Sequence, residues 1–206
     1  MDMNYIQKKI SNRKGKPLGI EKDFSVLLPL IKIKDELHIL YEVRSKNLDT
    51  QPGEISFPGG MVENGETYKD AAVRETIEEL NIGKENITII GELDYIMTPF
   101  NISIYPFVGL LKDLKTDSID FNYDEVEEIF TVPLSFFIEN EPFEYYMYIE
   151  PQVDDDFPYH LIQNGKDYNW RKGKYPVYFY KYEDYIIWGI TARITKNFID
   201  LIKSKI

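Results

Sequence analysis

Three glutamates stand close together in the middle of the chain. Glu75, Glu78 and Glu79 occupy positions i, i+3 and i+4, so on a helix they would share one face. Like charges at this spacing repel one another, and a cation among them would relieve the repulsion. Carboxylate oxygens from one helix, joined by a loop carbonyl, are the hard ligands that Mg²⁺ or Mn²⁺ prefers. The spacing therefore predicts a divalent metal site.

The surrounding residues predict how such a site is positioned. Thr67, with Asp70 three residues later, has the form of a capping box, and neither Gly nor Pro interrupts the chain from there to Leu80. A helix is therefore expected, with Asn81 able to adopt the left-handed conformation that ends it. Arg74 lies beside the glutamates, where it would orient a carboxylate or contact a phosphate.

Two glycines precede this helix. Gly59 and Gly60 follow Phe57 and Pro58, and they would let the backbone turn tightly and leave a carbonyl facing a ligand. The sequence thus predicts a glycine turn and an acidic helix that face the same ion.

The stretch resembles the Nudix box, Gly-x5-Glu-x7-Arg-Glu-U-x-Glu-Glu-x-Gly-U, in which U is a bulky aliphatic residue. The positions that match in type and spacing are Gly60, Glu66, Arg74, Glu75, Glu78, Glu79 and Ile82. Thr76 stands at the first U and Asn81 replaces the last Gly. Neither departure removes a carboxylate. The alternative interpretation is a solvated, Glu-rich helix after a glycine turn.

The resemblance implies a fold, a reaction and a set of roles. It implies an α/β fold with a mixed sheet between helices, and hydrolysis of a diphosphate linked to another moiety with Mg²⁺ or Mn²⁺ as cofactor. The three glutamates would be metal ligands, and the carbonyl of Gly59 or Gly60 would complete the shell. Glu66 and Arg74 would support the helix and the ligands. The base that accepts the water proton would be one of the glutamates or a carboxylate from residues 125–128.

A second resemblance, to the coenzyme A pyrophosphatase branch of that family, covers the segment before the box. Its pattern is Leu-Leu-Thr-x-Arg-[Ser/Ala]-x3-Arg-x3-Gly-x3-Phe-Pro-Gly-Gly, and the matching residues are Leu40, Arg44, Ser45, Gly53, Phe57, Pro58, Gly59 and Gly60. Arg44, Ser45 and Phe57 thereby become candidates for binding substrate, although Arg44 alternatively forms a surface salt bridge.

Three residues of this segment depart from the branch pattern. Tyr41 and Glu42 replace Leu and Thr, and Asp49 stands where the pattern has its second Arg. An anion in place of a cation removes a partner for the phosphates of coenzyme A. The residues at 187–194 also resemble the corresponding segment of this branch.

A further acidic segment lies outside the box. Residues 124–133 read as a strand whose alternation places Val126, Glu128 and Phe130 on one face. Glu125 and Glu128 are the candidates for an additional ligand or base, and solvated strand charges are the alternative.

Composition sets the remaining limits. The 206 residues fit one domain, residues 1–206, and a net charge of −11 argues against nucleic-acid and membrane partners. A small nucleotide diphosphate is the expected partner. The chain has no Cys, and its first residues lack a long apolar run, so we expect neither disulfides nor a signal peptide, and a cytoplasmic location.

The remaining elements are predicted from periodicity. Residues 1–22 read as an N-terminal helix, 3–12, and a loop. Strands are expected over 24–33, 37–44, 87–96, 102–111, 176–182 and 185–189, with Pro106 marking a bulge or a sheet edge, and Thr191 is expected to cap a final helix.

Residues 140–175 are an extra segment, interpreted as a lid, a homodimer surface or decoration. Trp170, beside Arg171 and Lys172, offers a stacking surface for adenine. Packing of Trp170 on the core is the alternative.

Three functions fit these observations. They are a coenzyme A-type pyrophosphatase, a pyrophosphatase for ADP-ribose or another nucleotide sugar or dinucleotide, and a Nudix domain that senses a nucleotide without turnover. The complete carboxylate set favours an enzyme.

Overall fold

A large mixed sheet forms the centre of the computed structural model, which describes residues 2–204. Its strands are β1 (Lys22–Ile33), β2 (Glu36–Arg44), β3 (Ile55–Ser56), β4 (Gly59–Met61), β5 (Ile87–Glu92), β6 (Ile96–Met97), β7 (Ile102–Leu111) and β8 (Val126–Pro133). The order is β3-β2-β1-β7-β5, with β4 beside β1, β6 beside β7 and β8 beside β2. Only β1 and β7 pair in parallel among these described strands. The domain expected over 1–206 includes residues 1, 205 and 206, which lie outside the described residues.

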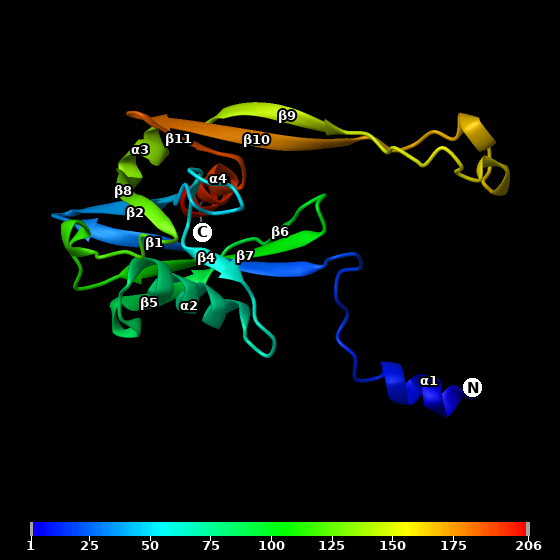
Figure 1. Cartoon of the computed structure of the whole chain (residues 1–206), viewed down its shortest axis with the longest axis horizontal. Helices are drawn as coiled ribbons and strands as arrows, with labels where there is room; N and C mark the ends of the chain where they lie inside the picture. Colours follow the sequence, from blue (N-terminus) through cyan, green and yellow to red (C-terminus); the bar gives the residue numbers. More distant parts are fainter. Residues whose placement is uncertain (1, 205–206) are drawn as a thin grey trace.

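Helices cover both faces of this sheet. Helix α2 (Tyr68–Leu80) packs on β1 and β4, and α4 (Gly189–Lys203) lies on the opposite face. A smaller antiparallel sheet of β9 (Phe143–Ile149), β10 (Gly173–Tyr182) and β11 (Tyr185–Trp188) covers α4 from outside (Figure 1). The short helix α3 (Leu134–Glu139) follows β8, and single 3-10 turns occupy 84–86, 116–118, 159–161 and 165–167. The expected mixed sheet between helices is confirmed.

Alternating apolar residues of β1 and β2 divide the core between the two faces. Tyr41 packs toward α4, where it joins Phe198, whereas Leu40 packs toward α2, where it joins Leu80. All of these side chains are buried, and each contributes roughly 1.5–3 kcal/mol through removal of apolar surface from water. The same alternation fixes which side chains of β2 point at α2.

The strand predicted over 87–96 is broken into β5 and β6. Pro106 accounts for the break: the N–H of Leu93 donates to the carbonyl of Pro106 at 2.9 Å, so the side on which Pro106 lacks an N–H faces the gap between β5 and β6. The prediction of a sheet edge was wrong, because β7 lies between β1 and β5.

The predicted alternation of β8 holds for Glu128 and Phe130, which share a face, but is wrong for Val126. Register shifts between Val43 and Arg44, so that Val43 pairs with Glu128 and Arg44 pairs with Val126. The bulge adds one residue, Glu127, and places Val126 and Glu128 on opposite faces.

Both terminal helices differ from expectation by a few residues. Helix α1 (Met3–Ile10) ends before residue 12 and buries none of its side chains. Helix α4 begins at Gly189, so Thr191 is not its cap; its hydroxyl instead donates to the carbonyl of Ile55 at 2.9 Å and ties α4 to β3. No helix within residues 2–204 is long and apolar enough to cross a membrane.

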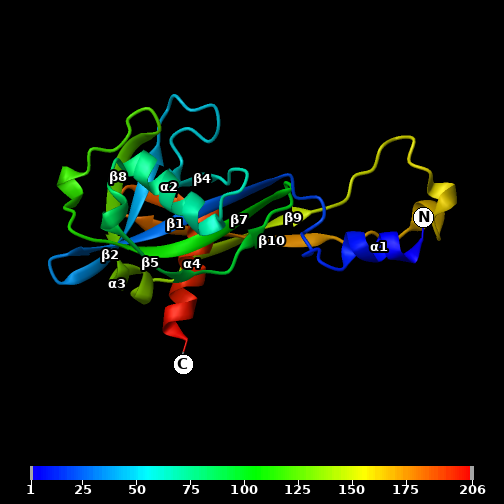
Figure 2. The ribbon, with the colours of Figure 1, turned by 90° about the horizontal axis from the view of Figure 1, so that it is seen from below.

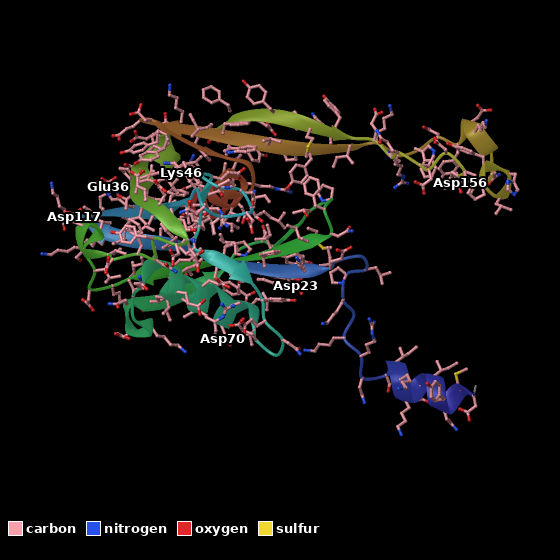
Figure 3. The ribbon with its side chains drawn as sticks, viewed as in Figure 1. Asp23, Glu36, Lys46, Asp70, Asp117 and Asp156 are labelled. Atoms are coloured by element: carbon pink, nitrogen blue, oxygen red, sulfur yellow. The ribbon has the colours of Figure 1, made fainter. Side chains whose placement is uncertain are left out.

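Residues 150–172 form the end of an arm that continues β9 and β10 away from the main sheet. Figure 2 shows the same separation from a second direction. Asp156 near the tip lies far along the arm from Asp70 on α2 (Figure 3). In this structure residues 150–172 do not cover α2, and the interpretation of 140–175 as a lid stays a prediction.

Candidate metal centre

The acidic helix is bounded as its sequence predicts. The N–H of Asp70 donates to the hydroxyl of Thr67, the N-cap residue, at 3.1 Å, and Asn81 ends the helix in the left-handed conformation with φ of 49°. The side-chain amide of Asn81 donates to the carbonyl of Asp120 at 2.7 Å. These contacts fix both ends of α2, and with them the heights of the three glutamates.

Arg74 links the helix to the loop before it. Its guanidinium donates to both carboxylate oxygens of Glu66, at 3.0 and 3.1 Å, to Oε1 of Glu75 at 2.8 Å and to Oε2 of Glu78 at 3.1 Å. Hydrogen bonds from Arg74 lower the pKa of Glu66. The guanidinium of Arg74 thus orients the carboxylates of three residues. Such contacts are typical of a residue that positions metal ligands.

Glu79 is the most buried of the three box glutamates. Its side chain lies between α2 and the glycine turn, with only 3% of the residue exposed, and Oε2 accepts the N–H of Gly59 at 2.8 Å. Burial, followed by the negative charge of Glu42, raises the pKa of Glu79 to about 10. A nearby cation would return such a carboxyl to its ionised form.

The two glycines allow close approach of different neighbours, the backbone of β1 at Gly59 and the Glu75 carboxylate at Gly60. A Cβ on Gly60 would lie 2.3 Å from the carboxylate of Glu75, and a Cβ on Gly59 would lie 2.4 Å from the carbonyl oxygen of Ser25. Neither position accepts a side chain without movement of its neighbours. This close approach explains why glycines stand here.

Register distinguishes the two glycine carbonyls. The N–H of Leu27 donates to the carbonyl of Pro58 at 2.9 Å, so the next pair, Val26 with Gly59, falls at a position that exchanges no ladder hydrogen bonds. The pair after it uses the carbonyl of Gly60 in the ladder. The carbonyl of Gly59 is therefore the one that remains for a ligand, on the same edge as the N–H that meets Glu79.

A second buried glutamate, Glu42 on β2, joins Glu79 and was not assigned a role from the sequence. It is 1% exposed; Ser56 donates to its Oε1 at 2.8 Å, and its Oε2 has no hydrogen-bond partner. Burial raises the pKa of Glu42 to about 7, and the charges of Glu125 and Glu75 act in the same direction. The departure from Thr in the coenzyme A pattern was the available signal.

The oxygen atoms of the box glutamates, Glu42 and Gly59 are suitable ligands for a divalent ion, but the glutamate side chains do not converge on one point in this structure. Within residues 2–204, no three acidic or histidine side chains lie close enough together to hold a metal as they stand. Glu75 is turned to Arg74, and Glu79 to Gly59. Hard oxygen donors and a buried carboxylate oxygen without a partner are nevertheless what Mg²⁺ or Mn²⁺ would take up.

The three candidate substrate-binding residues from the segment before the box, Arg44, Ser45 and Phe57, differ from one another in burial and contacts. Phe57 is 4% exposed and stacks on Tyr41 at 5.0 Å between ring centroids, so in this structure it packs in the core. Ser45 is buried, and its hydroxyl accepts the N–H of Asn47. Arg44 is half-buried, and its Nε has no partner. Arg44 makes no salt bridge among the described residues.

Only one of the two outer carboxylates lies near the box glutamates. The charge of Glu125 raises the pKa values of Glu42, Glu75 and Glu79, which places Glu125 beside them. Glu128 pairs with Val43, on the α4 side of the sheet, and accepts a hydrogen bond from Tyr185. The structure does not bring Glu128 to the site.

Trp170 lies at the end of the arm. It contacts Tyr168 and Phe157 edge to face, with ring centroids 4.9 and 5.8 Å apart. This aromatic cluster is distant from α2 in both views (Figures 1 and 2). In this structure Trp170 therefore packs within the arm and not on the main core.

The cavity beside α2 lies at the other end of the helix. It has a volume of about 310 Å³ and is lined by residues that include Thr67, Tyr68, Tyr95 and Tyr105. Tyr68 and Tyr105 stack with centroids 3.6 Å apart. The cavity thus adjoins the beginning of α2, whereas Glu75, Glu78 and Glu79 lie in the last turns of the helix.

These features define a class of protein, a mixed sheet between helices with carboxylates from one helix meeting a glycine turn. The family model described as NUDIX domain matches residues 25–148, more than half of the chain. The chain therefore belongs to the Nudix family.

The chain is also similar to individual members of the family, at moderate sequence identity. Nudix hydrolase 3 of Caenorhabditis elegans is 36% identical over 53% of this chain, and the match covers 47% of that protein. The peroxisomal coenzyme A diphosphatase ndx-8 of the same organism is 33% identical over 69% of this chain and 60% of its own length. The chain thus spans about half the length of these curated relatives.

A solved structure supports the fold. The MutT/nudix family protein from Enterococcus faecalis superposes with a TM-score of 0.53, covering 99% of this chain and 71% of that chain at 14% sequence identity.

Proposed function

We propose that the chain is a pyrophosphohydrolase that cleaves a nucleoside diphosphate linked to another moiety, with Mg²⁺ or Mn²⁺ as cofactor. The observation that carries this proposal is the buried carboxylate of Glu79 against the glycine turn. Burial of a carboxylate is costly unless a cation or hydrogen bonds compensate it. Here Gly59 supplies one hydrogen bond, and a divalent ion would supply the remaining compensation.

Glu75, Glu78 and Glu79 are the proposed metal ligands, joined by the carbonyl of Gly59. A bound divalent ion would neutralise phosphate oxygens and lower the pKa of an attacking water. Arg74 holds Glu75 and Glu78 in place through its hydrogen bonds. Loss of a positioning contact of this kind typically costs 10- to 100-fold in affinity or activity, on the order seen for outer-shell partners of metal ligands.

Glu125 is the proposed proton acceptor from outside the box. It is half-buried, and its Oε1 accepts the side-chain amide of Asn122 at 3.3 Å. The backbone ties this loop to the site, since the N–H of Asn122 donates to the carbonyl of Glu79 at 2.8 Å and the N–H of Ser45 to that of Glu125 at 2.8 Å. Glu125 is thereby held beside the box glutamates on a fixed loop, as a base needs to be.

Coenzyme A or a related adenine nucleotide is the proposed substrate. The match to a peroxisomal coenzyme A diphosphatase supports this choice, and so does Arg44, a half-buried cation that makes no salt bridge within residues 2–204 and can pair with a phosphate. Asp49, which is exposed, opposes it. ADP-ribose or another nucleotide sugar or dinucleotide is the second candidate, and a nucleotide sensor without turnover is the third.

A substrate panel tests these alternatives. The native chain and Asp49→Arg are assayed with coenzyme A and ADP-ribose in Mg²⁺ and in Mn²⁺. If position 49 serves coenzyme A, the substitution raises kcat/KM for coenzyme A more than for ADP-ribose. Equal changes for both substrates would assign Asp49 to the solvated surface. Binding of nucleotides without turnover of any would favour the sensor.

A homodimer and a cytoplasmic location are also proposals. The arm carries an exposed apolar surface that includes Phe143 and Tyr145, which suits a second subunit. The cytoplasmic location stays a prediction, and the coenzyme A diphosphatase relative carries the word peroxisomal in its name.

A further inference from the structure

Glu42 reaches the metal centre from the sheet and not from the helix. Successive residues of a strand point to opposite faces, so Glu42 shares a face with Leu40, which packs against Leu80 at the end of α2. The neighbour of Glu42 across the sheet on that face is Ile129 of β8, which also packs against this cluster. The carboxylate therefore points into the layer between β2 and the last turn of α2.

The surroundings of Glu42 leave half of its carboxylate uncompensated. Ser56, opposite Glu42 on β3, holds Oε1, while Oε2 is buried without a partner. A buried acceptor left unpaired costs about 1–3 kcal/mol, and more when it is charged. A sequence that retains this arrangement needs something to bind the second oxygen.

The neighbours of Oε2 are themselves mostly acidic. Glu79, Glu75 and Glu125 all lie near enough for their charges to act on Glu42 or for Glu42 to act on them. Two arginines adjoin this group. Arg74 pairs with Glu75 at 2.8 Å and is shared with Glu66 and Glu78, whereas Arg44, on the same face of β2, makes no salt bridge with Glu42 at 4.0 Å or less within the described residues. The carboxylates therefore outnumber the arginines, and negative charge is in excess.

We infer that Glu42 is an additional metal-binding residue, whose free oxygen takes a divalent cation jointly with Glu79. This inference rests on the proposed function because it requires a divalent ion beside α2. It adds to that function a ligand on β2, at a position where the coenzyme A pattern has Thr. Ser56 then acts as the positioning residue, because its hydroxyl fixes which oxygen of Glu42 remains free.

Binding of Mn²⁺ alone, without substrate, tests the inference. Free Mn²⁺ is measured by electron paramagnetic resonance during titration of the full chain, for the native protein, Glu42→Gln and Glu79→Gln. Glu128→Gln is the matched control, since it removes an exposed carboxylate on the other face of the same sheet. We expect Glu42→Gln to weaken Mn²⁺ binding at least tenfold or to remove one bound ion, and Glu128→Gln to leave both quantities unchanged.

The two single-site variants separate the inference from the function on which it rests. If Glu79→Gln weakens Mn²⁺ binding while Glu42→Gln binds as the native chain does, the metal centre stands and the role of Glu42 is overturned. If both variants bind Mn²⁺ as the native chain does, the metal centre on α2 is overturned as well.

Glu42→Asp covers the case in which Glu42→Gln does not fold. It keeps the charge and withdraws the carboxylate by one methylene. A metal-binding residue loses Mn²⁺ affinity on this change, whereas a carboxylate that only balances Arg44 does not, and unchanged affinity would overturn the inference. In the absence of metal, Glu42→Gln should unfold at the same temperature as the native chain or higher, because it removes an uncompensated buried charge.

Discussion

Replacing Glu79 by Gln separates the charge of this side chain from its shape. The Gln carbonyl can still accept the N–H of Gly59, a contact of 2.8 Å in the native chain, and the buried volume is unchanged. The ionisable group next to Glu42 and Glu75 is removed. Without metal, the native carboxyl stays protonated in the fold at neutral pH although it ionises in the unfolded chain, which costs stability. Removal of about 1 kcal/mol of that cost would raise Tm by roughly 2–4 °C for a domain of this size.

With metal the same substitution is expected to act in the opposite direction. Saturating metal at 100 times its Kd stabilises a protein by about 2.7 kcal/mol, and each tenfold loss of affinity removes about 1.4 kcal/mol of that gain. A missing electrostatic contact to the transition state lowers kcat by about 10² or more. Glu79→Gln should therefore unfold higher than the native chain in EDTA, gain less from Mg²⁺, and turn over about 10² times more slowly.

Thermal unfolding with and without Mg²⁺, together with initial rates, measures all three effects on one preparation. Near-normal turnover by Glu79→Gln would refute its assignment as a ligand. A lower Tm in EDTA would refute the account of its burial, because Glu79 would then stabilise the fold without a cation.

Three further outcomes follow from the geometry. Gly60→Ala should push the Glu75 carboxylate aside, since a Cβ at position 60 would lie 2.3 Å from it, and should weaken Mn²⁺ binding several-fold. Gly91→Ala is the matched control, because its Cβ would meet no atom within 4 Å. Equal Mn²⁺ affinities of the two variants would contradict the role of Gly60. The pKa of Glu79 is raised in the fold to about 10 from 4.5, so the stability that protonation of Glu79 contributes is fully present below pH 4.5 and is lost as pH rises toward 10. The Tm of the native chain in EDTA should therefore fall over this range more steeply than that of Glu79→Gln. Parallel curves for the two proteins would contradict the raised pKa. Trp170→Ala should leave KM unchanged, because Trp170 packs at the end of the arm; a tenfold rise in KM would mean that the arm reaches a site, for example that of a second subunit.

The sequence predicts the acidic helix well because its signals are local. The cap at Thr67, the left-handed Asn81 and the spacing of the glutamates all act within one or two helical turns. The mixed sheet was expected from the resemblance to the family, and the long apolar runs of β1, β2 and β7 agree with it.

The errors arise where distant segments decide the outcome. The break at Pro106 depends on how β5 and β6 share β7, and the face of Val126 depends on a bulge opposite Val43 and Arg44. Glu42 reads in the sequence as an ordinary charge on a strand, and its burial is visible only when β2, β3 and α2 are assembled. Phe57 belongs to a motif associated with substrate, but its ring is taken up by the core.

Metal dependence of hydrolysis decides whether the acidic face of α2 is a catalytic metal centre. Purified full chain is assayed for release of phosphorylated products from coenzyme A and from ADP-ribose in Mg²⁺, then in excess EDTA, and again after Mg²⁺ is restored. The metal-centre account predicts turnover of at least one substrate with Mg²⁺ or Mn²⁺, loss of turnover in EDTA, and recovery when the ion returns. Turnover that persists in EDTA would contradict it.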